Sequence, residues 1–307
     1  MAARWSLSLA RARPLSVATT IPKIVRRVGG VQRASFSLHR PSLFPSPWRK
    51  ESGGGKEIRR MASKSEMDKW LEAAKDGKWP RAFGNMDVGY PQPTEEEHSA
   101  TVIWLHGLGD VSGWAHVSEY FEMPWVKFLF PNAPEGKVMC GFPQWFSPSA
   151  LGPSKSHNDH DGLLESAAFI SAIILKEKAR GIPPGRIVLA GVSQGGAVAL
   201  TSGLLLQDEP IGGIVGLSTW LPSLVDGDGL GQEVAAKTEV LLCHGTRDTT
   251  AKFAWGEGAA GSLSELGVNV RFTAYEDMGH GFHDEEMAEV LPDIEDFLRE
   301  ILPETPP

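Results

Sequence analysis

Gly191-Val192-Ser193-Gln194-Gly195 is the stretch that decides the fold of this chain. A continuous apolar run precedes it at 186–190, and a helical pattern follows to about residue 206. A nucleophile elbow has this form, because its serine stands on a strained strand-to-helix turn at the top of a sheet. Flanking glycines let backbones approach where a Cβ would clash. The stretch predicts a nucleophilic Ser193; the alternative is a Gly-rich strand–helix connection with a solvated serine.

The rest of the body alternates between short apolar runs and longer helical patterns. Most of the apolar runs are continuous, which is typical of strands buried on both faces of a parallel sheet. We expect strands at 101–105, 126–130, 186–190, 212–217, 239–244 and 268–275, and helices at 161–180, 193–206, 253–266 and 284–301. This alternation predicts an open α/β sheet, mostly parallel, with helices on both faces and an active site at the carboxyl ends of its strands.

Composition narrows the class of protein further. The 307 residues are 41% hydrophobic and 22% charged, which fits a globular chain with a sizeable core. The two cysteines, Cys140 and Cys243, are far apart, which argues against a disulfide framework and for a reducing compartment. No apolar run approaches the roughly 20 residues of a membrane span, so we expect no transmembrane segment.

Charge is distributed unevenly along the chain. Residues 1–60 contain 13 Lys/Arg and two acids, so a net charge of −8 for the whole chain leaves −19 on the remainder. An acidic body argues against nucleic acid as a partner. The first 50 residues contain no acid and no long apolar run, which is typical of a mitochondrial or chloroplast transit peptide. A disordered basic tail, or a second start at Met61 giving a cytoplasmic form, are the alternatives.

The predicted domain organisation follows from this charge pattern. We expect residues 1–64 to be an extension and residues 65–307 to form the folded body, for which length alone allows one large or two ordinary domains, beginning with a short amphipathic helix at 65–80. Residues 131–160 are rich in Pro, Gly and aromatic side chains. A segment of this length without periodicity is usually a lid or a substrate-binding loop.

A serine nucleophile needs a base, usually a histidine oriented by a carboxylate. Asp248 follows the predicted strand 239–244, and His280 follows the last strand, in the chain order Ser, Asp, His of α/β-hydrolases. His283 competes with His280 as the base but precedes an acidic run that begins the next helix. Among the other carboxylates we weighed, Asp277 is too close to His280 in sequence to orient it; Asp226 and Asp228 resemble surface-turn residues.

The oxyanion of acyl transfer needs two preorganised N–H donors. We expect one from Gln194, the residue after the nucleophile, and one from Leu108 in the Gly-rich turn after the strand 101–105. The run 157–161 contains two histidines and two aspartates, but with no further ligands nearby we expect no metal; Asp161 is a helix N-cap or a first-turn acid instead.

These residues lie in a set of motifs that resembles a known family. The motifs are Leu105-His106-Gly107-Leu108-Gly109-Asp110, Phe130-Pro131-Asn132-Ala133-Pro134, Gln144-Trp145-Phe146, Gly181-Ile182-Pro183, Gly191-Val192-Ser193-Gln194-Gly195-Gly196-Ala197, Leu217-Ser218-Thr219-Trp220-Leu221-Pro222, Cys243-His244-Gly245-Thr246-Arg247-Asp248 and Tyr275-Glu276-Asp277-Met278-Gly279-His280. Over about residues 97–303 the chain resembles the acyl-protein thioesterase/lysophospholipase group of the phospholipase/carboxylesterase family. It departs from the usual family pattern at Ser147, where many members have Asp, and after Asp248.

The resemblance implies a single-domain α/β-hydrolase fold and a serine hydrolase that needs no cofactor. Its implied triad is Ser193, Asp248 and His280, with the N–H groups of Leu108 and Gln194 as oxyanion donors. Its implied substrates are acyl thioesters or esters, including S-acylated proteins and lysophospholipids. The alternatives are a general short-chain carboxylesterase and, from another class, a non-catalytic ligand receptor. Four residues are expected to line the acyl pocket: Trp145, Phe146, Trp220 and Leu221.

Overall fold

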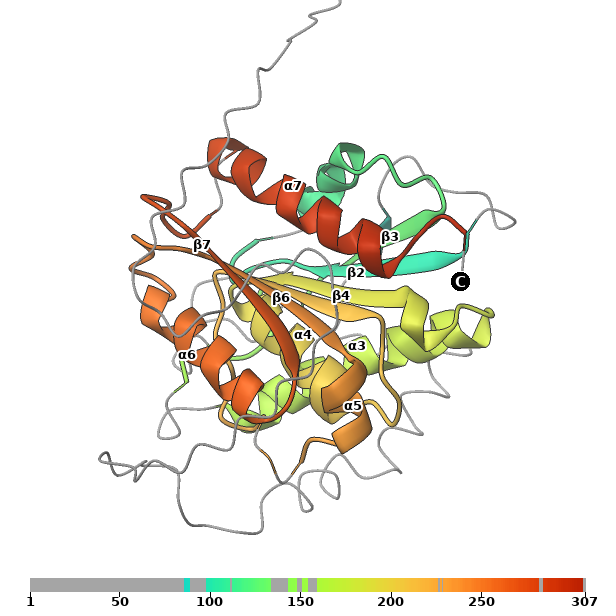
Figure 1. Cartoon of the computed structure of the whole chain (residues 1–307), viewed down its shortest axis with the longest axis horizontal. Helices are drawn as coiled ribbons and strands as arrows, with labels where there is room; N and C mark the ends of the chain where they lie inside the picture. The colour runs from blue at the N-terminus through green and yellow to red at the C-terminus, as the bar shows by residue number, and fades with distance from the viewer. Residues whose placement is uncertain are drawn as a thin grey trace, which may run out of the picture. The chain divides into compact units, whose positions relative to one another are not determined.

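The computed structural model describes residues 86–88, 98–110, 112–133, 143–147, 151–153, 159–225, 227, 229–281 and 284–305, all within one compact unit, Ser46–Pro307. The strands are β1 (Met86–Val88), β2 (Ala100–Leu105), β3 (Val126–Pro131), β4 (Ile187–Val192), β5 (Gly213–Leu217), β6 (Glu239–Gly245) and β7 (Asn269–Tyr275). The helices are α3 (His160–Ala179), α4 (Gln194–Leu205), α5 (Gln232–Lys237), α6 (Phe253–Glu265) and α7 (Asp284–Ile301), with the 3₁₀ helices η1 (Ser112–Tyr120) and η4 (Pro184–Arg186) (Figure 1).

The seven strands form one sheet in the order β1-β3-β2-β4-β5-β6-β7. Only β1 is antiparallel to its neighbour, β3; the other pairs are parallel. The chain places β3 on one side of β2 and then returns to place β4 on the other side. In open α/β sheets the crevice at the carboxyl ends of strands at such a reversal binds ligands. Leu105 and Gly191 are paired at this point, immediately before the elbow.

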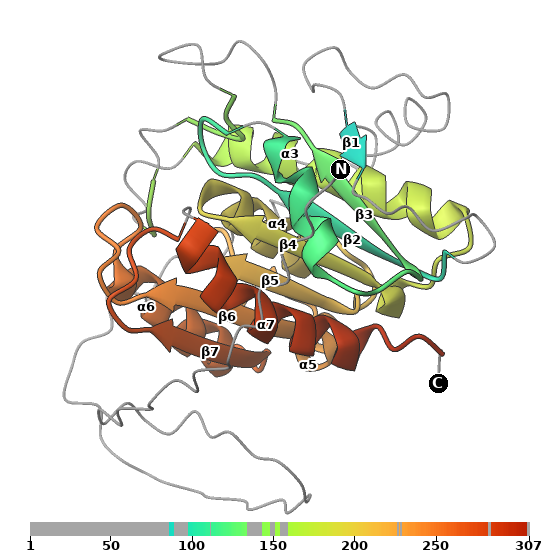
Figure 2. The same ribbon diagram turned by 90° about the horizontal axis from the view of Figure 1, so that it is seen from above.

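Helices cover both faces of the sheet (Figures 1 and 2). Residues of α3, α4, α5 and α6 pack on one face, and residues of η1 and α7 pack on the other. Successive residues of β2 alternate between these two cores: Ile103 and Leu105 face the first, Val102 and Trp104 the second. Because both faces are covered, the strand is apolar except at Thr101, whose buried hydroxyl donates to Oε2 of Glu177 at 3.0 Å.

The predicted α/β architecture is confirmed, and the expected strands and helices agree with the observed ones within two residues. The sequence did not indicate β1, η1 or α5. Each is too short or too aperiodic for a pattern: β1 has three residues and α5 has six. The expected helix at 65–80 lies outside the described residues, as do most residues of the segment 131–160.

The ends of α3 follow their local sequence signals. Asp159 caps the amino end by accepting a hydrogen bond from Gly162 N–H. Asp161 lies in the first turn, where its negative charge interacts favourably with the positive end of the helix dipole. At the other end Gly181 adopts a φ of 99°, which a Cβ would disfavour. None of the described helices combines the length and the apolar character needed to cross a bilayer.

Candidate active site

Ser193 occupies the turn between β4 and α4 with φ 53° and ψ −117°. A non-glycine residue in such a sparsely populated region costs about 1–3 kcal/mol and persists only where its surroundings hold it. Two contacts do so here. The N–H of Ser193 donates to the carbonyl of Leu217 at 2.8 Å, and the hydroxyl of Thr219 donates to the carbonyl of Ser193 at 2.7 Å. The last residue of β5 and the turn that follows it therefore hold both backbone polar groups of the serine.

The glycines around Ser193 are required by close backbone approach. A Cβ on Gly195 would lie 2.5 Å from the carbonyl oxygen of His106 and 2.6 Å from that of Leu105. A Cβ on Gly191 would lie 2.5 Å from backbone atoms of Gly195. The elbow thus packs directly on the end of β2, and the prediction that its glycines permit such contact is confirmed.

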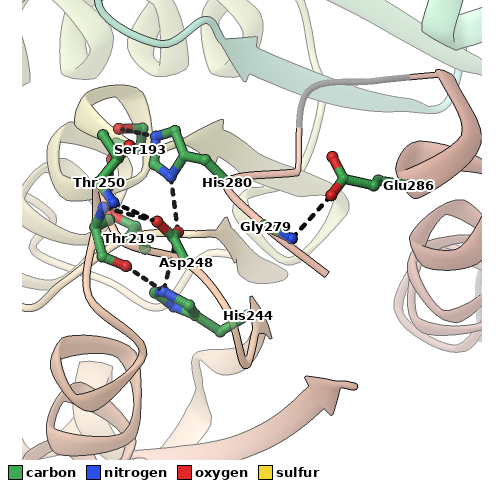
Figure 3. A network of polar contacts seen from close by, with 9 residues as sticks. Ser193, Thr219, His244, Asp248, Thr250, Gly279, His280 and Glu286 are labelled. Carbon is green, nitrogen blue, oxygen red and sulfur yellow. Dashed lines mark hydrogen bonds and ion pairs between the residues drawn. The ribbon is translucent and has the colours of Figure 1, made fainter. Parts of the chain in front are cut away.

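His280 lies between Ser193 and Asp248 (Figure 3). Its Nδ1 is 2.7 Å from Oδ2 of Asp248, and its Nε2 is 3.1 Å from Oγ of Ser193. A carboxylate can only accept, so Nδ1 carries the hydrogen and Nε2 is left to accept from the serine hydroxyl. The structure therefore brings together the serine, histidine and carboxylate that the sequence nominated, from the ends of β4, β7 and β6.

The carboxylate of Asp248 is buried and accepts several hydrogen bonds. Its Oδ1 accepts from the N–H groups of Thr250 and Ala251, each at 2.9 Å. Its Oδ2 lies beside both His280 and His244, whose Nε2 is 3.3 Å away. Burial raises the pKa of this carboxyl, but hydrogen bonds and charge from the two histidines outweigh it and lower the pKa to about 2. Asp248 is therefore ionised at neutral pH.

Backbone contacts join the loop that carries Asp248 to the loop that carries His280. Thr246 N–H donates to the carbonyl of Tyr275, and Arg247 N–H donates to that of Met278, both at 2.9 Å. Asp277, weighed above as an alternative carboxylate, forms an exposed ion pair with Arg247 instead. These contacts keep the two loops at a constant separation, which sets the distance between carboxylate and imidazole.

The first turn of α7 holds the loop that carries His280 from another side. Gly279 N–H, one residue before the histidine, donates to Oε1 of Glu286 at 2.8 Å (Figure 3). The competing base His283 and the carboxylates Asp226 and Asp228 lie outside the described residues.

The Gly-rich turn after β2 is anchored by His106. Its Nδ1 donates to the carbonyl of Gly107 at 2.7 Å, and its Nε2 accepts from Ala133 N–H at 3.0 Å. Burial lowers the pKa of His106 below the usual histidine value, although the Gly107 hydrogen bond and nearby Asp110 oppose this. Leu108, two residues after His106, has a side chain that is 37% exposed.

Gln194, the first residue of α4, fastens the aromatic segment 143–147 to the elbow. Its Oε1 accepts from Trp145 N–H at 2.8 Å and its Nε2 donates to the carbonyl of Phe146 at 2.7 Å. The indole of Trp145 donates to the carbonyl of His106 at 2.8 Å. The same few residues therefore tie together the elbow, the turn after β2 and the aromatic segment.

The aromatic residues proposed to line the acyl pocket are packed together beside the elbow. Phe146 and Trp220 meet edge to face at 6.3 Å, and Trp220 meets Trp255 in the same way at 6.0 Å. Trp145, Phe146, Trp220 and Leu221 are all buried. Trp255 was not singled out because its sequence context is that of an ordinary helix. In this structure Trp220 packs on Phe146 and Trp255 packs on Trp220, and these contacts anchor the aromatic segment 143–147.

Asp159, in the histidine- and aspartate-rich run 157–161, has a structural role. Its two oxygens accept from Gly162 N–H at 3.0 Å and from Ser147 N–H at 2.8 Å, so it caps α3 and holds the end of the aromatic segment. In the part of the chain that the structure describes, no three His, Cys, Asp or Glu side chains are grouped to hold a metal ion.

Sequence reasoning assigned no role to Thr219 or His244. Both lie in motifs that it quoted, at or just beyond strand ends. The contact of Thr219 with the carbonyl of Ser193 joins the ends of neighbouring strands that are 26 residues apart, so no spacing rule predicts it. His244 contacts the carboxylate of Asp248, four residues later in the chain, where the loop after β6 turns back on the strand.

A strained serine after a central parallel strand, beside a histidine and a buried carboxylate from two later strands, defines an α/β-hydrolase with a serine-type site. Residues 91–300 match the model of the phospholipase/carboxylesterase family. The chain belongs to this family and is an ester or thioester hydrolase.

Individual relatives agree with this assignment. Acyl-protein thioesterase 1 of Neurospora crassa is 37% identical over 226 residues, which are 69% of this chain and 90% of that protein. A probable carboxylesterase, SOBER1-like, of Arabidopsis thaliana is 38% identical over 196 residues, 61% of this chain and 74% of that one. The crystal structure of Zea mays acyl-protein thioesterase 2 superposes with a TM-score of 0.58 at 31% identity, covering 70% of this chain and 99% of that structure. Arabidopsis thaliana SOBER1 gives 0.59 at 32% identity, covering 66% and 99%.

Proposed function

We propose that this enzyme acts as an acyl-protein thioesterase or as an esterase of the lysophospholipase type, with Ser193 as its nucleophile. The observation that carries the proposal is the position of His280, which contacts Ser193 Oγ through one ring nitrogen and Asp248 Oδ2 through the other. Relatives named acyl-protein thioesterase 1, 37% and 36% identical to this chain, support the thioester substrate.

In the proposed reaction Ser193 Oγ attacks the acyl carbon while its proton passes to Nε2 of His280. The carboxylate of Asp248 keeps the ring in the correct tautomer and stabilises the imidazolium that forms. The oxyanion of the tetrahedral intermediate accepts hydrogen bonds from the backbone N–H groups of Leu108 and Gln194. As the intermediate collapses, His280 protonates the departing thiolate or alkoxide. Water then attacks the acyl-enzyme with the same base.

Labelling of Ser193 by a fluorophosphonate tests whether the site is catalytic. We expect the folded wild-type protein to be labelled and the Ser193→Ala variant not to be. Absence of label on folded wild-type protein would exclude the enzyme mechanism and favour a ligand receptor.

The identity of the base has its own test. His280→Ala should lower kcat by several orders of magnitude, because removing a triad member leaves only the contribution of binding and the oxyanion donors. His283→Ala is the matched comparison. If His280→Ala retained near-normal turnover of a short-chain ester, the base would have to be reassigned to His283.

A general short-chain carboxylesterase is the second candidate. The relatives named as probable carboxylesterases favour it. Paired thioesters and oxygen esters of increasing acyl length discriminate the two. A rise of kcat/KM with chain length on thioesters supports the thioesterase, whereas a preference for short oxygen esters supports the carboxylesterase.

The basic segment 1–60 is proposed to direct the protein to mitochondria or chloroplasts. Its support is compositional: 13 Lys/Arg, two acids and no long apolar run. A fusion of residues 1–60 to a fluorescent reporter should enter one of these organelles. A diffuse cytoplasmic signal would argue instead for a basic tail.

A further inference from the structure

Ser193 carries two backbone groups whose orientation matters for the proposed reaction. Its carbonyl oxygen shares a planar peptide unit with the N–H of Gln194, the proposed oxyanion donor. In a trans peptide the two bonds point in opposite directions, so whatever holds the Ser193 carbonyl also aims the Gln194 N–H. The structure gives this carbonyl two donors: the N–H of Ala197, which is the first helical bond of α4 at 3.2 Å, and the hydroxyl of Thr219 at 2.7 Å.

The shorter of these contacts is fully buried. Thr219 is 2% exposed, and its side chain lies against the elbow: a Cβ on Gly196 would come within 2.7 Å of the threonine Cβ. Its methyl group packs on the other side, 2.9 Å from where a Cβ of Gly216 would stand. The hydroxyl is therefore confined to one direction, toward the carbonyl of Ser193.

The backbone before Thr219 is itself strained. Ser218 has a φ of 46°, an uncommon conformation for a residue with a side chain. This turn follows β5 directly and lets Leu217 and Thr219 both reach Ser193, one through its carbonyl and the other through its hydroxyl. The strained turn at Ser218, whose N–H donates to the carbonyl of Cys243 at 2.8 Å, thus places the two residues that hold the strained Ser193. Strain of this kind persists only where neighbouring contacts determine the conformation.

We infer that Thr219 is a positioning residue for catalysis: its hydroxyl orients the Ser193–Gln194 peptide so that the Gln194 N–H faces the developing oxyanion. This rests on the proposed function, because it assumes that Ser193 is acylated. The residue touches neither the substrate nor the reacting atoms. Its effect is expected in the transition state, where the negative charge develops on the former carbonyl oxygen, and not in the binding of the substrate.

The test compares Thr219→Ser with Thr219→Ala, two variants that differ by one hydroxyl group and both lack the packing methyl. We expect kcat on a thioester to be about 10-fold lower for Thr219→Ala than for Thr219→Ser, with KM equal within about twofold. This is less than the roughly 10²–10³-fold cost of removing an oxyanion donor. Both variants are assayed at a temperature well below the midpoint of their thermal unfolding. A difference in kcat then does not come from a loss of folded protein.

A second readout isolates the oxyanion. An alkyl trifluoromethyl ketone accepts Ser193 Oγ at its carbonyl carbon, while the serine proton moves to His280 and the ketone oxygen becomes an oxyanion. The Ki of the ketone should be about 10-fold higher for Thr219→Ala than for Thr219→Ser. The Ki of the matching fatty acid should be the same for both variants. Equal kcat and equal ketone Ki in the two variants would overturn this inference and leave the proposed function untouched. A wild-type protein that turns over no ester and takes no fluorophosphonate label would overturn the proposed function, and this inference with it.

Discussion

His244 and Asp248 are in contact behind the proposed catalytic histidine: Nε2 of His244 lies 3.3 Å from Oδ2 of Asp248 and 2.7 Å from the carbonyl oxygen of Ala251. The carbonyl can only accept, so Nε2 carries the hydrogen and points toward both oxygens. The imidazole is 2% exposed and meets Phe253 edge to face at 5.9 Å. A second histidine thus braces the carboxylate from the side opposite His280 (Figure 3).

Removing the donor at position 244 should weaken the orientation of Asp248. His244→Met has no donor, and we expect it to lower kcat about 10-fold, in line with a lost hydrogen bond to a charged group. His244→Gln can still donate and should retain more of the activity. The control is the Asp248→Asn background: if His244 acts through the carboxylate, His244→Met should cost little more activity there. An equal loss in both backgrounds would indicate a general effect on the fold.

The buried His106 should make stability depend on pH. Because burial lowers its pKa in the folded state, the unfolded chain binds the extra proton first as pH falls below about 6.5. The free energy of unfolding should therefore fall with decreasing pH until the folded pKa is reached, by at most about 1.4 kcal/mol per pH unit from this group. His106→Gln, which can still accept from Ala133 N–H, should flatten that slope in urea unfolding between pH 7.5 and 5. Parallel profiles for both proteins would contradict the assignment.

The Gln194 side chain should matter for substrate binding as well as for stability. Gln194→Ala retains the backbone N–H but leaves the buried N–H of Trp145 unpaired, at a cost of about 1–3 kcal/mol. We expect KM for long-chain substrates to rise, because the aromatic segment is released. Gln207→Ala is a matched control, since Gln207 is also a buried amide but bonds to Ser171 and Ser202. A similar KM in both variants would show that the aromatic segment does not contribute to substrate binding.

Glycines of the two helices α4 and α6 should respond in opposite ways to alanine. Around Gly258 and Gly261, exposed in α6, a Cβ meets nothing within 4 Å, so each alanine should stabilise the protein by about 0.5–1 kcal/mol. This corresponds to a rise in Tm of about 2–4 °C per kcal/mol. Gly195→Ala places its Cβ against the carbonyls of Leu105 and His106 and should lower both Tm and kcat. Scanning calorimetry and an ester assay on the three variants decide the matter.

Much of the fold could be read from local patterns. Short apolar runs indicated β2 to β7, and most of these runs are continuous, since strands covered on both faces have no polar side. The edge strand β7 is the exception, with polar residues between its apolar ones and partial exposure along its length. Gly181, Pro183 and Pro184 indicated the end of α3, because glycine readily adopts the left-handed conformation that ends a helix and proline has no N–H with which to continue one. The strand β1 was not predictable, because three residues hold no period and its place beside β3 depends on the sheet already being present.

The proposed site likewise has residues that the sequence could identify and contacts that it could not. Ser193, Asp248 and His280 could be nominated from the sequence because each residue type has its own chemistry and follows a predicted strand, and parallel strands end at one edge of a sheet. That order alone determined which residues could meet. Only the tertiary structure decided how they are held. Thr219 bonds to a carbonyl 26 residues away and His280 to a hydroxyl 87 residues away, and such contacts exist only once neighbouring strands have been packed into register.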